Sequence, residues 1–267
     1  MTDLKNLIIT GTSSGMGEAA AQYLGERGYR VFGGNLDGEK GVTGPGITSH
    51  ELDIRSDESV DRFMKEVPDR IDALINNAGF ALAGAVEETS LEEARDQVET
   101  NLFGAIRMCR KVIPTMRVQG HGRIINTSSG AAVAAGPFHA IYSASKFGVV
   151  GFTEALRHEV GPFEIHVSIL QPGCFRTKVV EHARQSRIVM PEYAGPRERC
   201  LEALKKYSAE APDPIHVARL FHRILQKKRP ALRYRIGKDV TLSHFFRRFL
   251  PESWYQGMIA DYYRLRK

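Results

Sequence analysis

The stretch that decides the fold is Thr10-Gly11-Thr12-Ser13-Ser14-Gly15-Met16-Gly17. It follows a short apolar run, Asn6–Thr10 (NLIIT), and it opens Gly15–Gly25, where small and apolar residues recur at helical spacing. Glycines let the backbone turn tightly and approach a pyrophosphate, and the following helix offers free N–H groups and a favourable dipole. A strand, this turn and a helix in that order predict a dinucleotide site, whereas the turn alone would also suit a simple bend. The cofactor contacts expected here are Gly11, Ser13, Ser14, Gly15, Met16 and Gly17.

Strands and helices alternate along the rest of the chain. Near-continuous apolar strands between helices indicate a parallel sheet covered on both faces. We therefore predict an α/β fold with a Rossmann-type doubly wound parallel sheet flanked by helices, in one domain, with a helical C-terminal extension over residues 241–267. The spacing predicts further strands over residues 30–34, 71–76, 122–127, 165–170 and 232–236, and helices over 59–67, 92–117, 142–161 and 217–225.

Composition excludes several classes of protein. Hydrophobic residues make up 42% and charged residues 25%, as in a globular domain. The net charge is +6, and the excess gathers in residues 219–267, which suits anionic partners. The three cysteines have no paired spacing, so we expect no disulfide framework and no metal site, and a cytoplasmic location. No run approaches the ~20 apolar residues of a membrane-spanning helix, and no apolar signal core stands at the start.

The glycine turn is the first of four motifs that together resemble the short-chain dehydrogenase/reductase family. The resemblance is close over roughly residues 4–180, loose to residue 238 and poor beyond. It implies a catalytic domain over residues 1–240, in which 178–214 form a lid over the substrate. The matching residues are Thr10, Gly11, Gly15 and Gly17 for TGxxxGxG, Asn76-Asn77-Ala78-Gly79 for NNAG, Tyr142-Ser143-Ala144-Ser145-Lys146 for YxxxK, and Pro172-Gly173 after the sixth strand.

Tyr142 and Lys146 are spaced to share one face of a helix. A tyrosine with a pKa near 10 is a poor base at neutral pH, but a cation held close favours the phenolate and lowers that pKa. Tyr142 can then take a proton from an alcohol or give one to a carbonyl oxygen. An isolated pair of this kind would be an ordinary surface contact, and the other three motifs favour the catalytic interpretation.

The resemblance assigns two further catalytic residues. Ser129 stands thirteen residues before Tyr142, as the family serine that binds the substrate oxygen does, and Ser128 would face the other way on an extended backbone. Asn101 resembles the asparagine that holds a water between Lys146 and solvent. The implied mechanism is direct hydride transfer, with Ser129 and Tyr142 stabilising the developing alkoxide.

The resemblance also implies the remaining cofactor contacts. Asp53 corresponds to the residue at the adenine amine, and Thr177 to the residue that holds the nicotinamide amide. The full set expected beyond the glycine turn is Asn35, Asp53, Ile54, Asn77, Ala78, Gly79, Tyr142, Lys146, Pro172, Gly173 and Thr177.

The end of the second predicted strand bears on the choice between NADP and NAD. An Asp there would bond the ribose 2′-hydroxyl, and an Arg nearby would accept a 2′-phosphate. Asn35 occupies that position, no Arg follows it, and Ser14 is neutral. The missing carboxylate favours NADP slightly, while Asp37 and Glu39 argue for NAD, so both cofactors stay open.

The sequence therefore predicts an NAD(P)-dependent oxidoreductase that moves a hydride between nicotinamide and a secondary alcohol, ketone or aldehyde. Residues 229–237 resemble the last strand of hydroxysteroid and retinol dehydrogenase-like members, which implies a bulky lipophilic substrate such as a steroid or retinoid. An NADP(H)-binding sensor with little turnover is the alternative. We expect a homo-oligomer, and no nucleic-acid partner because no recognition motif is present.

The extension over residues 241–267 is aromatic and basic. Ordinary packing on the domain is the favoured interpretation, because so many aromatic side chains in water would expose a large apolar patch. A lid over the active site, a subunit contact and a helix on a membrane surface are the alternatives.

Overall fold

The computed structural model describes residues 5–37, 41–177 and 183–265. Its main sheet has seven strands in the order β3-β2-β1-β4-β6-β7-β9, and every pairing is parallel. The order reverses beside β1, so the carboxyl ends of β1 and β4 form the switch point at which such sheets bind ligands. The strands are β1 (Asn6–Thr10), β2 (Arg30–Asn35), β3 (Ile47–Glu51), β4 (Ala73–Asn76), β6 (Gly122–Thr127), β7 (Ile165–Pro172) and β9 (Arg233–Ile236).

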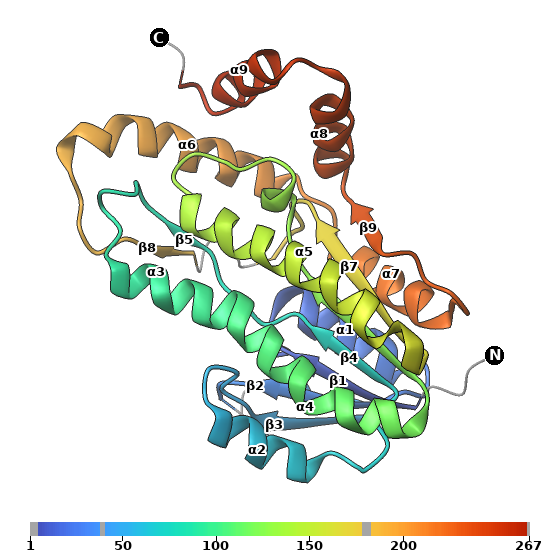
Figure 1. Cartoon of the computed structure of the whole chain (residues 1–267). Coiled ribbons are helices and arrows are strands. Elements are labelled where there is room, and N and C mark those ends of the chain that lie inside the picture. The colour runs from blue at the N-terminus through green and yellow to red at the C-terminus, as the bar shows by residue number, and fades with distance from the viewer. Residues whose placement is uncertain (1–4, 38–40, 178–182, 266–267) are drawn as a thin grey trace.

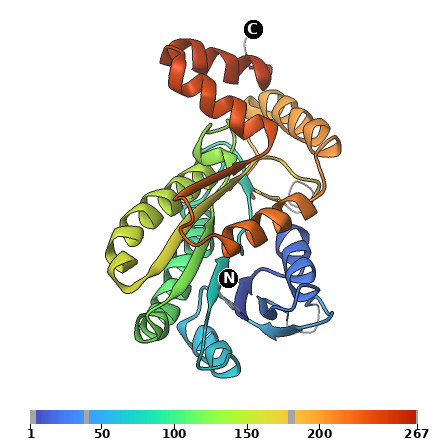
Figure 2. The ribbon, with the colours of Figure 1, turned by 90° about the vertical axis from the view of Figure 1, so that its right-hand side faces the viewer.

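Helices cover both faces of this sheet (Figures 1 and 2). On one face α1 (Gly15–Gly25) and α7 (Ile215–Gln226) bury Leu24 and Phe221 against the strands. On the other face α2 (Asp57–Glu66), α4 (Gly104–Gln119) and α5 (Ala140–Val160) bury a second core that includes Phe63 and Met108. Each such side chain contributes about 1.5–3 kcal/mol on burial. The predicted doubly wound α/β fold is confirmed.

Several elements differ from the prediction. The edge strand β3, with the sequence ITSHE, was not predicted, because it is half-exposed and has a single large apolar residue. The helix predicted over 92–117 is divided into α3 (Leu91–Val98), a π-helical turn η2 (Glu99–Phe103) and α4. A small sheet also joins β5 (Leu82–Ala83) to β8 (Arg184–Gln185), which are about 100 residues apart in the chain. Strands of two residues are too short to show an alternating apolar pattern, so the sequence could not predict this pairing.

Residues 183–265 form the remaining elements of the chain. α6 (Pro191–Ala209) lies within the predicted lid, whose residues 178–182 are outside the described part. The C-terminal extension consists of two helices, α8 (Lys238–Phe249) and α9 (Glu252–Tyr262), with Pro251 between them. A proline lacks the N–H that a continuous helix would use there. Short 3-10 turns η3 (Gly130–Ala132) and η4 (Gly161–Phe163) flank α5, and among the described residues no helix could span a membrane.

Candidate active site

The glycine turn forms a cradle at the carboxyl end of β1. Gly11 has φ +73° and Gly15 has φ +63°, a left-handed conformation that favours glycine. A Cβ on Gly17 would lie 2.0 Å from the carbonyl oxygen of Gly11, so no larger residue fits. Ser14, at the N-cap of α1, makes no side-chain cap bond to the first-turn N–H groups. The cradle therefore fits a pyrophosphate, which such N–H groups and the helix dipole would bind.

The NNAG segment is bonded directly to this turn. The Asn77 Nδ2 donates to the carbonyl oxygens of Thr10 at 3.2 Å and Gly11 at 3.1 Å. The Thr10 hydroxyl oxygen accepts the backbone N–H of both Asn77 and Ala78 at 3.0 Å. A Cβ on Gly79 would lie 2.7 Å from the Asn101 side-chain oxygen, so the segment also closely approaches η2. These bonds fix the end of β4 against the end of β1.

Lys146 and Tyr142 project from α5 toward the same space. The Lys146 Nζ is buried, donates to the carbonyl oxygen of Thr127 at 3.1 Å, and lies 5.9 Å from the centroid of the Tyr142 ring. Burial lowers the pKa of Lys146 to about 8. Burial also raises the pKa of Tyr142, and a side-chain hydrogen bond with Ser129 acts in the opposite direction. The expectation that the neighbouring cation lowers the tyrosine pKa is thus not met in this structure, because burial is the largest influence on that pKa and raises it.

The two candidate serines point to different partners. Ser128 is buried and its hydroxyl donates to the carbonyl oxygen of Lys146 at 2.9 Å. Ser129 caps η3 by accepting the Ala131 N–H at 3.1 Å, and it also hydrogen-bonds Tyr142. Ser129 is therefore the serine whose hydroxyl lies beside the phenol.

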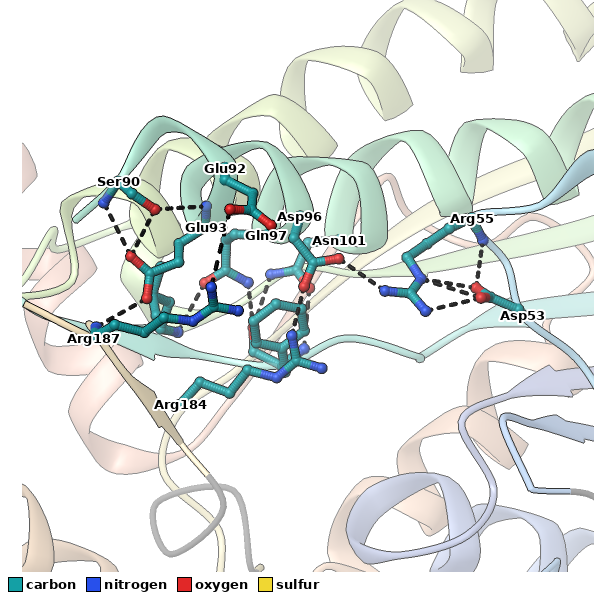
Figure 3. Close-up of polar contacts among 12 residues, drawn as sticks. Asp53, Arg55, Ser90, Glu92, Glu93, Asp96, Gln97, Asn101, Arg184 and Arg187 are labelled. Carbon is teal, nitrogen blue, oxygen red and sulfur yellow. Dashed lines mark hydrogen bonds and ion pairs between the residues drawn. The ribbon is translucent and has the colours of Figure 1, made fainter.

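Asn101 occupies the π-helical turn that interrupts the long helix (Figure 3). Its side-chain oxygen accepts the Phe80 N–H, and its Nδ2 donates to the Phe80 carbonyl oxygen and to the Ser145 hydroxyl, all at 3.0 Å. These bonds tie the chain after NNAG to α5, one residue before Lys146. π turns inside α-helices frequently occur at functional sites. The helix changes its geometry at Asn101.

Asp53 is held by an ionic network rather than left open (Figure 3). Its two carboxylate oxygens accept from the Arg55 Nε at 2.9 Å and Nη2 at 2.8 Å, which lowers the pKa of Asp53. The Arg55 Nη1 continues to Asp96 at 2.8 Å, and Asp96 also binds Arg184. The Arg184 guanidinium lies 4.0 Å from the Phe80 ring centroid. The network links the end of β3 to β8 across α3.

Asn35 and Ile54, two of the predicted cofactor residues, are buried. Asn35 is 5% exposed, its Nδ2 lies 3.4 Å from the Thr12 hydroxyl, and its buried side-chain oxygen has no hydrogen-bond partner. Ile54 is buried, and a Cβ on Gly104 would clash with it. Any contact of Asn35 with a ribose therefore requires its side chain to turn.

A cavity of about 230 Å³ opens between these elements. Most of the predicted residues line it: Gly11, Ser13, Ser14, Gly15, Met16, Asn77, Ala78, Gly79, Ser129, Tyr142, Lys146, Pro172, Gly173 and Thr177. Five predicted residues do not line the cavity: Gly17, Asn35, Asp53, Ile54 and Asn101. Five residues that were not predicted line it as well, namely Phe80, Thr127, Ser128, Cys174 and Phe175. Each of these lies within two positions of a motif residue or of Ser129, and that proximity is the signal that the sequence offered.

Asp239 is a structural contact that the sequence did not indicate. Its Oδ2 accepts the backbone N–H of Cys174 at 2.9 Å. A Cβ on Gly173 would lie 1.9 Å from its Oδ1, so a larger residue there would displace the Asp239 carboxylate. Asp239 stands in the first turn of α8, and it therefore joins the C-terminal helices to the rim of the cavity.

Comparison with known proteins agrees with this geometry. A family model described as short chain dehydrogenase matches residues 5–188. The 3-ketodihydrosphingosine reductase of Bacteroides thetaiotaomicron is 34% identical over 97% of this chain and 98% of its own, and human retinol dehydrogenase 8 is 30% identical over 86% and 80%. A short chain dehydrogenase from Burkholderia cenocepacia, solved in complex with NADP, has a TM-score of 0.76 at 26% identity, with 98% of each chain covered.

Proposed function

Because the chain belongs to the short chain dehydrogenase family and is an NAD(P)-dependent oxidoreductase, we propose that it interconverts a ketone and a secondary alcohol on a bulky lipophilic substrate. The convergence of Ser129, Tyr142 and Lys146 on one cavity beside the glycine cradle carries this proposal. The bound nicotinamide supplies or receives the hydride, and the protein supplies position and proton control.

The raised pKa of Tyr142 assigns its role in the reduction direction. A phenol that stays protonated at neutral pH is a proton donor, so Tyr142 gives its proton to the carbonyl oxygen as that oxygen becomes an alkoxide. Ser129 donates a second hydrogen bond to the same oxygen. Lys146 places a positive charge 5.9 Å from the Tyr142 ring, which favours the phenolate left after transfer. Asn101 positions α5 through Ser145.

An apolar substrate suits the side chains that reach this space. Phe80 and Phe175 line the cavity. Outside this lining, Phe138 in the loop before α5 packs edge-on against Tyr193 of α6, with ring centroids 6.4 Å apart. The names of the two curated relatives, a sphingoid-base reductase and a retinol dehydrogenase, support a substrate of this class. His139 binds the carbonyl oxygen of Pro137, and burial lowers its pKa, which supports a packed, neutral histidine.

Turnover of a ketone panel tests the proposal. The purified chain would be mixed with NADPH or NADH and with ketones matched in the reacting group but differing in the length of their apolar chain. We expect kcat/KM to rise with apolar length. Turnover only with short polar ketones would overturn the substrate class, and cofactor binding with no turnover of any ketone would favour the sensor alternative.

We propose that NADP is the preferred cofactor and that position 35 controls the preference. Asn35→Asp is expected to shift the preference toward NADH, because a carboxylate at the end of β2 repels a 2′-phosphate and bonds a free 2′-hydroxyl. The ratio of kcat/KM for NADPH and NADH measures the shift, with Asn6→Asp on β1 as a control away from the cavity. An unchanged ratio would mean that the ribose is recognised elsewhere, with Ser14 the first alternative.

We propose that residues 178–214 form the lid over the substrate and that Glu88 anchors it. Glu88 is buried, accepts the Met190 N–H at 2.8 Å and the Ala85 N–H at 3.0 Å, and pairs with Arg197 of α6. The bond from Arg197 lowers the pKa of Glu88 to about 2.

Glu88→Gln is expected to lower the free energy of unfolding by about 1–3 kcal/mol at neutral pH. The folded-state pKa lies below the ordinary value of 4.5, so the contribution is present above pH ~4.5 and is lost as pH falls toward ~2. Urea unfolding at pH 7 and pH 3 measures it, and Glu87→Gln, an exposed neighbour, is the control. Equal losses at both pH values would contradict the ionic origin.

A further inference from the structure

The C-terminal helices carry a stripe of exposed apolar side chains. On α8 the stripe consists of Leu242, Phe245 and Phe249, which are 54%, 55% and 65% exposed. Trp254 and Met258, which are 69% and 41% exposed, continue it on α9, whereas the Tyr262 ring packs against Tyr207 of α6. Spacings of three and four residues place each set on one side of its helix. We call these five exposed residues the outer apolar face, namely Leu242, Phe245, Phe249, Trp254 and Met258.

Other side chains of the same helices account for the packing that the sequence led us to expect. Val240 and Tyr255 are 2% and 3% exposed, and the Tyr255 hydroxyl bonds that of Ser243 at 2.7 Å. Arg247 donates to the carbonyl oxygen of Val133, in the loop after Ser129. The two helices are therefore seated on the domain, and the outer apolar face is not the side that contacts the cavity.

Charge around the outer apolar face is mainly positive. Lys238, Arg248 and Arg264 are exposed on or beside α8 and α9, and the Arg248 guanidinium lies 5.9 Å from the Phe249 ring centroid. Three acids lie on these helices: Asp239 is turned inward to the Cys174 N–H, whereas Glu252, which binds Gln256, and Asp261 are exposed. Figure 2 shows both helices at one end of the molecule, beyond the strand ends. An aromatic, cationic helix surface suits the interface of a membrane with anionic headgroups.

We propose that the outer apolar face docks on the surface of a bilayer that contains anionic lipids. A second copy of the chain would bring the same positive charges against this face, whereas anionic headgroups neutralise them. Asp239 connects α8 to Gly173 and Cys174 at the cavity rim, so docking would hold the cavity close to the bilayer. The attachment does not require that the substrate be a lipid.

Trp254 makes the test direct, because it is the single tryptophan of the chain. The full chain would be titrated with vesicles of phosphatidylcholine alone and of phosphatidylcholine with phosphatidylglycerol. With the anionic vesicles we expect the Trp254 emission to shift to the blue and iodide quenching to fall. Raising the salt concentration should reverse both effects, because it screens the charges.

A double variant identifies the surface. Phe245→Ser/Phe249→Ser is expected to weaken vesicle binding at least about tenfold, because the variant lacks two aromatic side chains that the bilayer would bury. Val118→Ser/Phe163→Ser is the matched control, since these side chains are 87% and 40% exposed near the amino edge of the sheet and should not matter. Lys238→Gln/Arg248→Gln should reduce the salt dependence. Reduction of a water-soluble ketone should stay unchanged in all three variants.

Three results would overturn the proposal. One is an unshifted Trp254 emission with anionic vesicles at low salt. Another is an equal loss of binding in the matched control. The third is protection of Trp254 from iodide in the absence of vesicles, together with a doubled mass by light scattering. That result would assign the outer apolar face to contact between two copies.

Discussion

Replacing Tyr142 by Phe is expected to lower kcat by about 10²–10⁴-fold, the usual contribution of a general acid–base group. The substitution removes only the phenolic O–H and keeps the ring, which lies 6.4 Å from the His139 ring. The Kd of the nicotinamide cofactor should therefore hardly change. Pre-steady-state reduction of a ketone and a separate titration with NADPH measure the two quantities.

Tyr193→Phe is the matched control for this experiment. Tyr193 is on α6, and its hydroxyl donates to Glu87 at 2.9 Å, outside the cavity that Tyr142 lines. It should leave the chemical step intact. A Tyr142→Phe enzyme within about threefold of the natural one would remove Tyr142 from the proton transfer, whatever the control shows.

Lys146→Met is expected to raise the cofactor Kd and also to lower kcat by at least about 10²-fold, because we propose that one buried ammonium binds the nicotinamide ribose and also stabilises the phenolate. The volume of the side chain is nearly kept, so the packing of α5 should survive. Reduced-nicotinamide fluorescence titration measures binding, and Lys206→Met on α6 is the surface control. An unchanged Kd for both NADPH and NADH would exclude the ribose contact.

The pH dependence of ketone reduction tests the charge of Lys146. Burial lowers its pKa to about 8, so the ammonium predominates below pH ~8 and is lost above it. We expect kcat to fall as pH rises through that value. Lys146→Arg keeps its charge over this range, and its residual activity should show no such fall. A natural enzyme whose kcat stays constant from pH 7 to pH ~10 would contradict the role assigned to the charge.

Local spacing in the sequence determined the fold class and the family. The turn from Thr10 to Gly17 needs left-handed glycines and a close approach at Gly17, and those requirements can be read from residue identity. Tyr142 and Lys146 lie one helical turn apart, so their shared face follows from the helix alone. Alternating apolar strands and helices then imply the doubly wound sheet. The lining of the cavity by most of the predicted residues agrees with these local rules.

Only the tertiary structure decided the features that depend on residues far apart in the chain. Cys174 and Asp239 are separated by 65 positions, and no local sequence pattern predicts the hydrogen bond between them. The largest influence on the pKa of Tyr142 is its burial by the fold. The presence of Lys146 four residues away therefore did not predict the direction of the pKa shift. The C-terminal extension shows the same limit. Periodicity predicted apolar helices, but the packing of α8 and α9 on the loop after Ser129 decided which aromatic side chains are covered and which face outward.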